Sequence, residues 1–331
     1  MPTFILGAGF NLDATAVAGS FFGQSLSDGT YRKDCGYPSL EALLHRCFNL
    51  DGLPPGKSVE DLFEESLVQR NNKPIQKLAD CLFEADHYIA LKLARAEDSN
   101  CYPRFFASFP DSHFLTFNYD SLVETFLLQL GRWRPDDGFG LPVKVTYDWN
   151  PPDQNDEDSR QQVLHLHGSI YVRTFNYQTC FDPGLEMDVL TRRSVPLYLF
   201  DPLYNAANFR GYSREPGQDH PKNQIIAPVP DKVQGLANSF VRQSYKRAQS
   251  LLRESRLAVA IGYSFNFHDR SSYGPLLTAF GESPGKELLV VAPDAVRIAE
   301  SLRYEAPQSI AVTPYSATFR EWADAGFPGV G

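Results

Sequence analysis

Two polar segments far apart in the chain hold the residue types that could do chemistry. Asn118 and Asp120 lie two positions apart in residues 116–120 (TFNYD), and His167 lies in residues 165–169 (HLHGS). Asparagine can hold a sugar hydroxyl or a water, and aspartate can accept a hydrogen bond from a carboxamide. A histidine, whose pKa is ordinarily about 6.5, can act as a base at neutral pH. Each segment follows an apolar run, as polar groups do at the exit of a buried strand.

The chain also opens with an apolar run, residues 3–6, that leads into Gly7, Ala8 and Gly9. Glycine lets a backbone approach a diphosphate closely, and the N–H groups of a following helix would point at the anion. The pattern G-x-G-x-x-G is not completed, because position 12 is Leu12. The segment therefore fits either a nucleotide loop or a tight structural turn. Together with the Asn/Asp pair and the histidine, it indicates NAD chemistry without hydride transfer.

Each of these features also has a plainer structural interpretation. Asparagine and aspartate commonly begin turns, so Asp120 could simply cap the helix that follows it. His165 and His167 would share one face of a strand, but zinc needs further ligands and no Cys or His lies at a useful spacing. We interpret the deeper His165 as a core histidine and His167, at the strand exit, as the catalytic candidate. His268 is interpreted as a surface residue, and the absence of a G-x-S-x-G elbow disfavours a Ser-His-Asp hydrolase.

Apolar runs alternate with helical periodicity along the chain, which is the signature of an α/β fold. Strands are expected at 3–6, 114–116, 163–168, 225–230, 257–261 and 288–292, and helices at 39–48, 58–95, 121–128 and 233–254. Ligands of such sheets gather beyond the carboxyl ends of the strands, where all the polar segments lie. We expect a Rossmann-like parallel sheet with helices on both faces.

The domain prediction is a single domain over 1–331 with two insertions. A helical insertion is expected at about 40–110, because helical spacing follows the first strand. An irregular insertion is expected at about 174–223, where aromatic residues and proline occur without a clear period. Either insertion could contact a second copy or a partner.

Composition and charge exclude several classes of protein. The 331 residues carry a formal net charge of -9 and no dense Lys/Arg run, so direct nucleic-acid binding is not expected. The five cysteines are scattered and form no C-x-x-C pair, which argues against a disulfide framework and a structural zinc site. Neither a signal peptide nor an apolar run approaching the ~20 residues of a membrane span is visible. We therefore expect a soluble, cytoplasmic protein without membrane contact.

Five segments, in order along the chain, resemble the sirtuin-like superfamily, specifically its prokaryotic branch of NAD-consuming anti-phage defence proteins. These segments are Gly7–Asn11, Thr116–Asp120, His165–Ser169, Gly262–Ser264 and Val291–Asp294. Residues 225–230 and 318–319 also resemble the defence branch. The resemblance implies a Rossmann-like sheet with NAD+ across its carboxyl edge.

The resemblance also implies a role for each matching residue. Asn118 would position water and the nicotinamide ribose, Asp120 would recognise the nicotinamide carboxamide, and His167 would be the catalytic histidine. The glycine loop would cradle the diphosphate, Gly262 and Ser264 would hold the adenosine side, and Asp294 would lie near the adenine ribose. The full set of implied NAD-binding residues is Gly7, Ala8, Gly9, Phe10, Asn11, Thr116, Gly262, Ser264 and Asp294.

The chain departs from the deacylating sirtuins in several places. It lacks a pattern of four zinc cysteines, so neither a zinc ribbon nor bound zinc is expected. The Pro-Asp-Phe-Arg segment is not found, and residues 37–40 (YPSL) occupy the comparable region. Asn11 replaces the usual serine of the phosphate loop, and Phe117 replaces the glutamine before the asparagine. These departures count against protein deacylation more than against NAD+ binding.

The combined expectation is an NAD+ hydrolase that forms nicotinamide and ADP-ribose, with NAD+ as its substrate. It would be the effector of a bacterial anti-phage system, gated by homo-oligomer formation or by a companion ATPase/helicase, nuclease or Argonaute-type protein. Two alternatives are an NAD-dependent protein deacylase and a non-catalytic sensor of NAD or ADP-ribose.

Overall fold

The computed structural model describes residues 1–12, 40–82, 86, 101–134, 137–141, 144–145, 160–174, 197–198, 222–226, 229 and 239–330. Several sequence predictions lie outside these residues. They are the YPSL segment up to Ser39, most of the 174–223 insertion, the start of the helix predicted at 233–254, and the side chain of His268.

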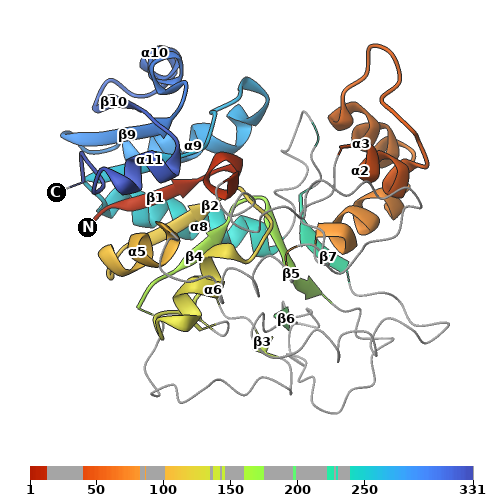
Figure 1. The fold of residues 1–331 in the computed structure, drawn as a ribbon, viewed down its shortest axis with the longest axis horizontal. Helices are drawn as coiled ribbons and strands as arrows, with labels where there is room; N and C mark the ends of the chain where they lie inside the picture. Colours follow the sequence, from red (N-terminus) through yellow and green to blue (C-terminus); the bar gives the residue numbers. More distant parts are fainter. Residues whose placement is uncertain are drawn as a thin grey trace.

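The centre of the fold is a six-stranded parallel sheet (Figure 1). Its strands are β1 (Thr3–Leu6), β2 (His113–Thr116), β4 (Val163–His165), β8 (Leu257–Ile261), β9 (Lys286–Ala292) and β10 (Ile310–Ser316). Their spatial order is β10-β9-β8-β1-β2-β4. The chain therefore builds outward from β1 through β2 and β4, and then outward on the other side through β8, β9 and β10. This is the doubly wound Rossmann order, and its direction reverses between β1 and β8. The predicted sheet is confirmed.

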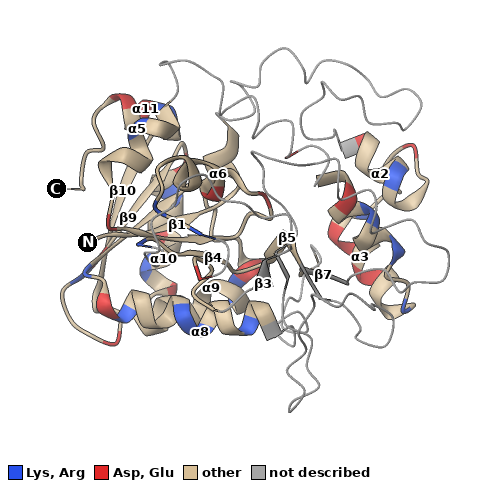
Figure 2. Ribbon diagram, turned by 90° about the horizontal axis from the view of Figure 1, so that it is seen from below, with Lys and Arg blue, Asp and Glu red and all other residues tan. Residues whose placement is uncertain are grey.

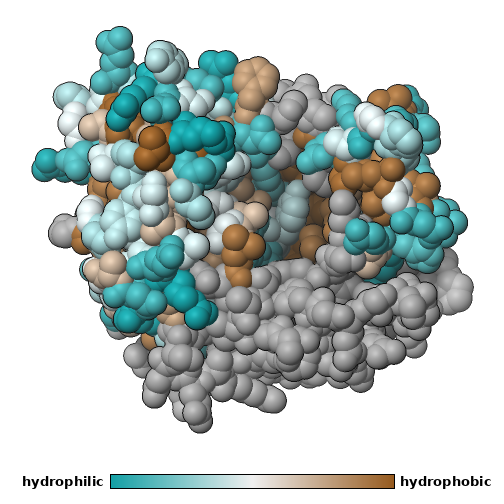
Figure 3. Space-filling view, turned by 45° about the horizontal axis from the view of Figure 1, so that its top comes forward, coloured by the Kyte–Doolittle hydropathy of each residue, from teal (hydrophilic) through white to brown (hydrophobic). Residues whose placement is uncertain are grey.

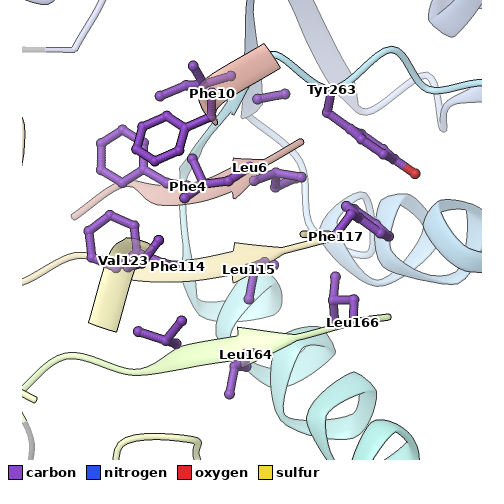
Figure 4. Packing of buried hydrophobic residues seen from close by; sticks show 14 of the residues in the cluster. Phe4, Leu6, Phe10, Phe114, Leu115, Phe117, Val123, Leu164, Leu166 and Tyr263 are labelled. Atoms are coloured by element: carbon purple, nitrogen blue, oxygen red, sulfur yellow. The ribbon is translucent and has the colours of Figure 1, made fainter. Parts of the chain in front are cut away.

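The inner strands are mostly apolar because helices cover both faces of the sheet. All four residues of β1 are buried. Phe4 packs against Phe114 of β2 and Phe105 of helix α5, with ring centroids 5.5 and 4.9 Å apart. Figure 4 shows this core and, beyond the strand ends, the side chains of Phe117 and Tyr263. A rigid sheet thus carries the loops that hold the predicted site.

Helices lie on both faces of the sheet, as predicted (Figure 2). One layer contains α5 (Cys101–Ser108), α6 (Leu122–Gln129) and α11 (Phe319–Asp324), and the other contains α8 (Ser239–Glu254), α9 (Arg270–Phe280) and α10 (Ala295–Glu305). The buried Lys286 connects β9 to the second layer of helices by hydrogen bonds. Its Nζ donates to the carbonyls of Arg253 and Ser255 at 2.7 and 2.5 Å, where α8 ends and backbone acceptors lack helical partners. None of the helices within the described residues is long and apolar enough to cross a bilayer.

A separate group of helices follows η1, the 3-10 turn Ala8–Asn11, along the chain. It contains α2 (Leu40–Phe48), α3 (Val59–Val68) and a helical stretch at 73–82. These helices share a small core of their own, formed by Cys47, Phe63, Leu78 and Val229. Figure 3 shows hydrophobic surface in the hollow between them and the body of the sheet.

The boundaries of these helices confirm one sequence prediction and correct another. Ser58 and Asp61 form the predicted capping box, with the Ser58 hydroxyl accepting from the Asp61 N–H at 3.1 Å. The continuous helix predicted for 58–95 is wrong, because α3 ends at Val68 and Arg70 has a left-handed backbone with φ of 56°. Apolar residues at helical spacing resume after this break. Hydrophobic periodicity alone therefore does not reveal where the helix ends.

A second, mixed sheet lies beside the first and has the order β3-β6-β5-β7. Its strands are β3 (Lys144–Val145), β5 (Gly168–Thr174), β6 (Leu197–Tyr198) and β7 (Lys222–Ile225). The strand predicted for 163–168 is therefore wrong at its end. It stops at His165, and Gly168, with φ of 86°, begins β5 after a corner that favours glycine. Likewise, the strand predicted to begin at 225 ends there.

Candidate functional site

The predicted site residues lie at one edge of the large sheet. Gly7 follows β1, Asn118 and Asp120 follow β2, and His167 follows β4. Gly262 follows β8 on the other side of β1. Because all these strands are parallel, their carboxyl ends meet at the same edge. The crevice beyond that edge, where the strand order reverses, is the usual ligand position in this kind of fold.

Where the strand order reverses, between β1 and β8, the backbones of the loops that follow these two strands are in contact. The N–H of Gly7 donates to Ile261 O at 3.1 Å, and that of Gly9 donates to Gly262 O at 2.9 Å. A Cβ at position 9 would lie 2.7 Å from the Gly262 Cα. A Cβ at position 262, where φ is 60°, would lie 2.3 Å from the Phe10 nitrogen. These glycines are therefore required by a tight turn, and contact of this loop with a diphosphate stays a prediction.

Side chains from the β1 and β2 loops form one hydrogen-bonded chain. The Asn118 Nδ2 donates to Gly7 O at 3.0 Å and to Asn11 Oδ1 at 3.1 Å. Asn11 Nδ2 in turn donates to Asp120 Oδ2 at 2.5 Å. The other carboxylate oxygen of Asp120 accepts from the Leu122 N–H at 3.1 Å, at the start of α6. The predicted Asn/Asp pair is thus held against the glycine loop, and Asp120 also accepts from the first residue of α6.

The carboxyl of Asp120 has an unusual protonation equilibrium. Burial, reinforced by the nearby carboxylate of Asp86, raises its pKa to about 7. Asp86 is itself buried and accepts from the Ser121 N–H at 3.0 Å and the Ser121 hydroxyl at 2.6 Å. It also accepts a hydrogen bond from the hydroxyl of Tyr171. Asp120 therefore changes charge near neutral pH, at the place where a substrate amide is expected.

A buried histidine and glutamate hold the backbone of Asn118. His165 Nδ1 lies 3.1 Å from Asn118 O, and its Nε2 lies 2.5 Å from Oε1 of Glu124 on α6. Both side chains are completely buried. Burial alone would lower the pKa of His165, but its interactions with Glu124, Asn118 and Asp120 together outweigh burial and raise it. The interpretation of His165 as a core histidine agrees with this geometry.

His167 lies among aromatic rings in the corner between β4 and β5. It is 4 % exposed, and its ring centroid lies 4.9 Å from that of Phe117. Phe117 also stacks on Tyr263 of the β8 loop, with centroids 4.1 Å apart and planes inclined by 2°. Phe117 and Tyr263 extend beyond the carboxyl ends of the central strands (Figure 4). The residue that replaces the expected glutamine thus packs His167 against the β8 loop.

The other predicted residues have varied surroundings. Thr116 is buried and its Oγ1 accepts from the Asn118 N–H at 3.0 Å, so it supports the loop. Phe10 is buried and its carbonyl accepts from the Tyr102 hydroxyl at 2.5 Å, whereas Ala8 and Ser264 are exposed. Asp294 follows β9, two strands from β1, and forms an ion pair with Arg297.

Residues 112–273 match the model of the SIR2-like domain family. This match supports a sirtuin-like protein. No curated protein matches the chain at a significant level. The matched residues run from β2 to α9 and include Asn118, Asp120, His167 and Gly262. SIR2-like domains are generally NAD-utilising enzymes, so the match supports an NAD-related activity.

Sequence reasoning missed two acidic residues of this candidate site. Glu124 is the only charged residue in α6, and every residue from Leu122 to Leu128 is buried. A single acid in an apolar helix calls for a buried partner, and that signal could have pointed to His165. Asp86 had no comparable signal, because its partners lie 35 and 85 positions away.

Within the described residues, no group of three or more His, Cys, Asp or Glu side chains is placed to hold a metal ion. The expectation that His165 and His167 share a strand face is wrong, because β4 ends at His165. His165 instead pairs with Glu124, and His167 packs on Phe117.

Proposed function

We propose that this chain is an NAD+ hydrolase, which cleaves NAD+ to nicotinamide and ADP-ribose. One observation carries the proposal: Asn118 and Asp120 are joined through Asn11 to the glycine loop at the reversal point of the sheet. Asn118 and Asp120 lie in the segment that matches the SIR2-like domain. A hydrolase of this kind needs an amide and a carboxylate at that place, one for water and ribose and one for the nicotinamide carboxamide.

The hydrogen bonds of Asn118 favour one role for it in the proposed reaction. Both protons of its Nδ2 are donated, to Gly7 O and to Asn11 Oδ1. The side-chain Oδ1 is then the atom with which Asn118 meets a ligand, and it can only accept. Water and the ribose hydroxyls are donors, so they are the groups that Asn118 would orient.

In the reaction, the bond between C1′ of the ribose and the nicotinamide nitrogen breaks. Its electron pair stays with the ring, which leaves as a neutral group, and charge develops at C1′ as in glycoside hydrolysis. Water held by Asn118 forms the new bond to C1′, and His167 takes its proton or that of a ribose hydroxyl. Asp120 holds the carboxamide and aligns the bond. A well-placed acid–base group typically contributes about 10²–10⁴-fold to the rate.

Nicotinamide release from NAD+ by the purified protein tests this proposal. The same assay with an acetylated peptide separates the alternatives. Release that requires the peptide would indicate a deacylase. Tight NAD+ binding without release, in every assembly state, would indicate a sensor. Release from NAD+ and water alone supports the hydrolase.

The proposal includes gating, because unregulated NAD+ hydrolysis would harm the host cell. The gate would be a homo-oligomer or a companion ATPase/helicase, nuclease or Argonaute-type protein in the cytoplasm, as in the anti-phage proteins that the sequence resembles. Activity measured across fractions of different size tests the gate. Full activity of the isolated chain in every assembly state would contradict it.

A further inference from the structure

The imidazole of His165 links the loop that carries Asn118 to the helix that follows it. One ring nitrogen meets Asn118 O at 3.1 Å and the other meets Glu124 Oε1 at 2.5 Å. Glu124 lies on α6, which starts directly after the loop. Neither His165 nor Glu124 is accessible to solvent, so neither can contact a substrate in this conformation.

The two contacts determine where protons lie. A backbone carbonyl can only accept, so Nδ1 of His165 must carry a proton. Nε2 faces a carboxyl oxygen, so one further proton lies between His165 and Glu124. That proton gives either an imidazolium–carboxylate pair or two neutral groups. In both cases Nδ1 carries the proton that points at Asn118 O, and Glu124 holds the other side of the ring.

We propose that His165 and Glu124 are positioning residues for Asn118. The inference rests on the proposed hydrolase function and adds to it a buried pair of residues that fixes the position of the loop carrying Asn118. The Asn118 side chain is fixed by Gly7 and Asn11, and its peptide is fixed by Thr116 on one side and His165 on the other. Loss of the His165 contact frees the carbonyl and lets the peptide rotate. The amide oxygen that orients water then moves with it.

A plain stabilising role is the competing explanation. Buried ion pairs often contribute little net stability, because removing two charges from water costs about as much as their attraction returns. Removal of only one partner is costly in either case. Stability alone therefore does not separate the two roles, and the test needs variants of matched size that break different contacts.

His165→Asn and His165→Gln provide that matched pair. The amide of asparagine falls near the place of Nδ1 and can still donate to Asn118 O, whereas that of glutamine falls near Nε2 and reaches Glu124. Both replace the ring by a neutral amide and remove one of the two contacts. The kcat and KM for nicotinamide release are measured for both, together with thermal unfolding and the low-field proton resonance of the buried imidazole in the wild type.

Positioning predicts that His165→Asn retains kcat within a few fold, while His165→Gln loses about 10²-fold, the usual effect of a small misplacement. The KM changes less than kcat in both. Equal kcat in the two variants, beside an active wild type, would overturn the inference. If the proposed hydrolase function itself is wrong, the result is different. The wild type then releases no nicotinamide although its low-field resonance is present. Absence of that resonance in the wild type, or its persistence in Glu124→Gln, would overturn the proposed pair directly.

Discussion

Asn11 Nδ2 donates to Asp120 Oδ2 across 2.5 Å, which joins the loop after β1 to the loop after β2. The same asparagine accepts from Asn118. The shorter side chain of a serine at position 11 could not bridge both partners. Asn11 therefore holds the second loop against the first.

We predict a measurable coupling between Asn11 and Asp120. A double-mutant cycle with Asn11→Ala, Asp120→Ala and the double variant, measured above the Asp120 pKa of about 7, should give about 1–3 kcal/mol in unfolding free energy, as for a hydrogen bond to a charged group. Urea unfolding measures it. Strictly additive effects of the two substitutions would contradict the bridge.

The raised pKa of Asp120 predicts a pH dependence of activity near neutrality. Below a pH of about 7 the carboxyl is protonated, and above it the carboxylate can accept from the substrate carboxamide. The kcat/KM should therefore rise with pH through about 7. Asp86→Asn removes the neighbouring charge, so the rise should move to lower pH. Asp111→Asn, on an exposed turn, serves as the control. A midpoint that Asp86→Asn leaves unchanged would contradict the assignment.

The same shift predicts how Asp120 affects stability. The folded state holds this proton to about pH 7, whereas an unfolded aspartate releases it at about pH 4. The stabilising contribution of Asp120 to the free energy of unfolding is thus fully present below the unfolded pKa, and it is lost as the pH rises through the folded pKa. Asp120→Asn should reduce the loss of unfolding free energy between these limits. Equal pH slopes for variant and wild type would show that Asp120 is not the group concerned.

The contact between the glycine loops predicts a strong cost for Gly262→Ala. The added Cβ meets the Phe10 nitrogen at 2.3 Å, and the left-handed backbone adds about 1–2 kcal/mol for an L-residue. Gly274→Ala is the matched control, because its Cβ meets nothing within 4 Å and it lies inside α9. There alanine should stabilise by up to about 1 kcal/mol. Calorimetric unfolding should show a clear decrease in Tm for the first variant and none for the second.

Much of this fold could be predicted from the sequence, because buried parallel strands appear in it as short runs of apolar residues. The ends of those runs also placed Gly7, Asn118 and Gly262 at one edge of the sheet. The corner at Gly168 was missed, since the alternation of His165, Leu166 and His167 continues past the true end of β4. A backbone turn with positive φ leaves no mark in hydrophobic periodicity.

The contacts inside the site could not be predicted for a different reason. The pairing of Glu124 with His165 joins residues 41 positions apart, and an acid in a helix is usually exposed. The stack of Phe117 on Tyr263 likewise depends on the packing of two loops. Local patterns identify which residues leave the sheet, and tertiary packing decides which of them meet.

The central claim is tested most directly by nicotinamide release from NAD+. Wild type is compared with His167→Ala, Asn118→Ala and the control His45→Ala, which changes an exposed histidine on α2. The account predicts release by the wild type and the control in the active assembly state. It predicts at least about 10²-fold less by the two site variants, with unchanged folding. Nicotinamide release at the wild-type rate by His167→Ala or Asn118→Ala would contradict the account. So would the absence of release by the wild type in every assembly state.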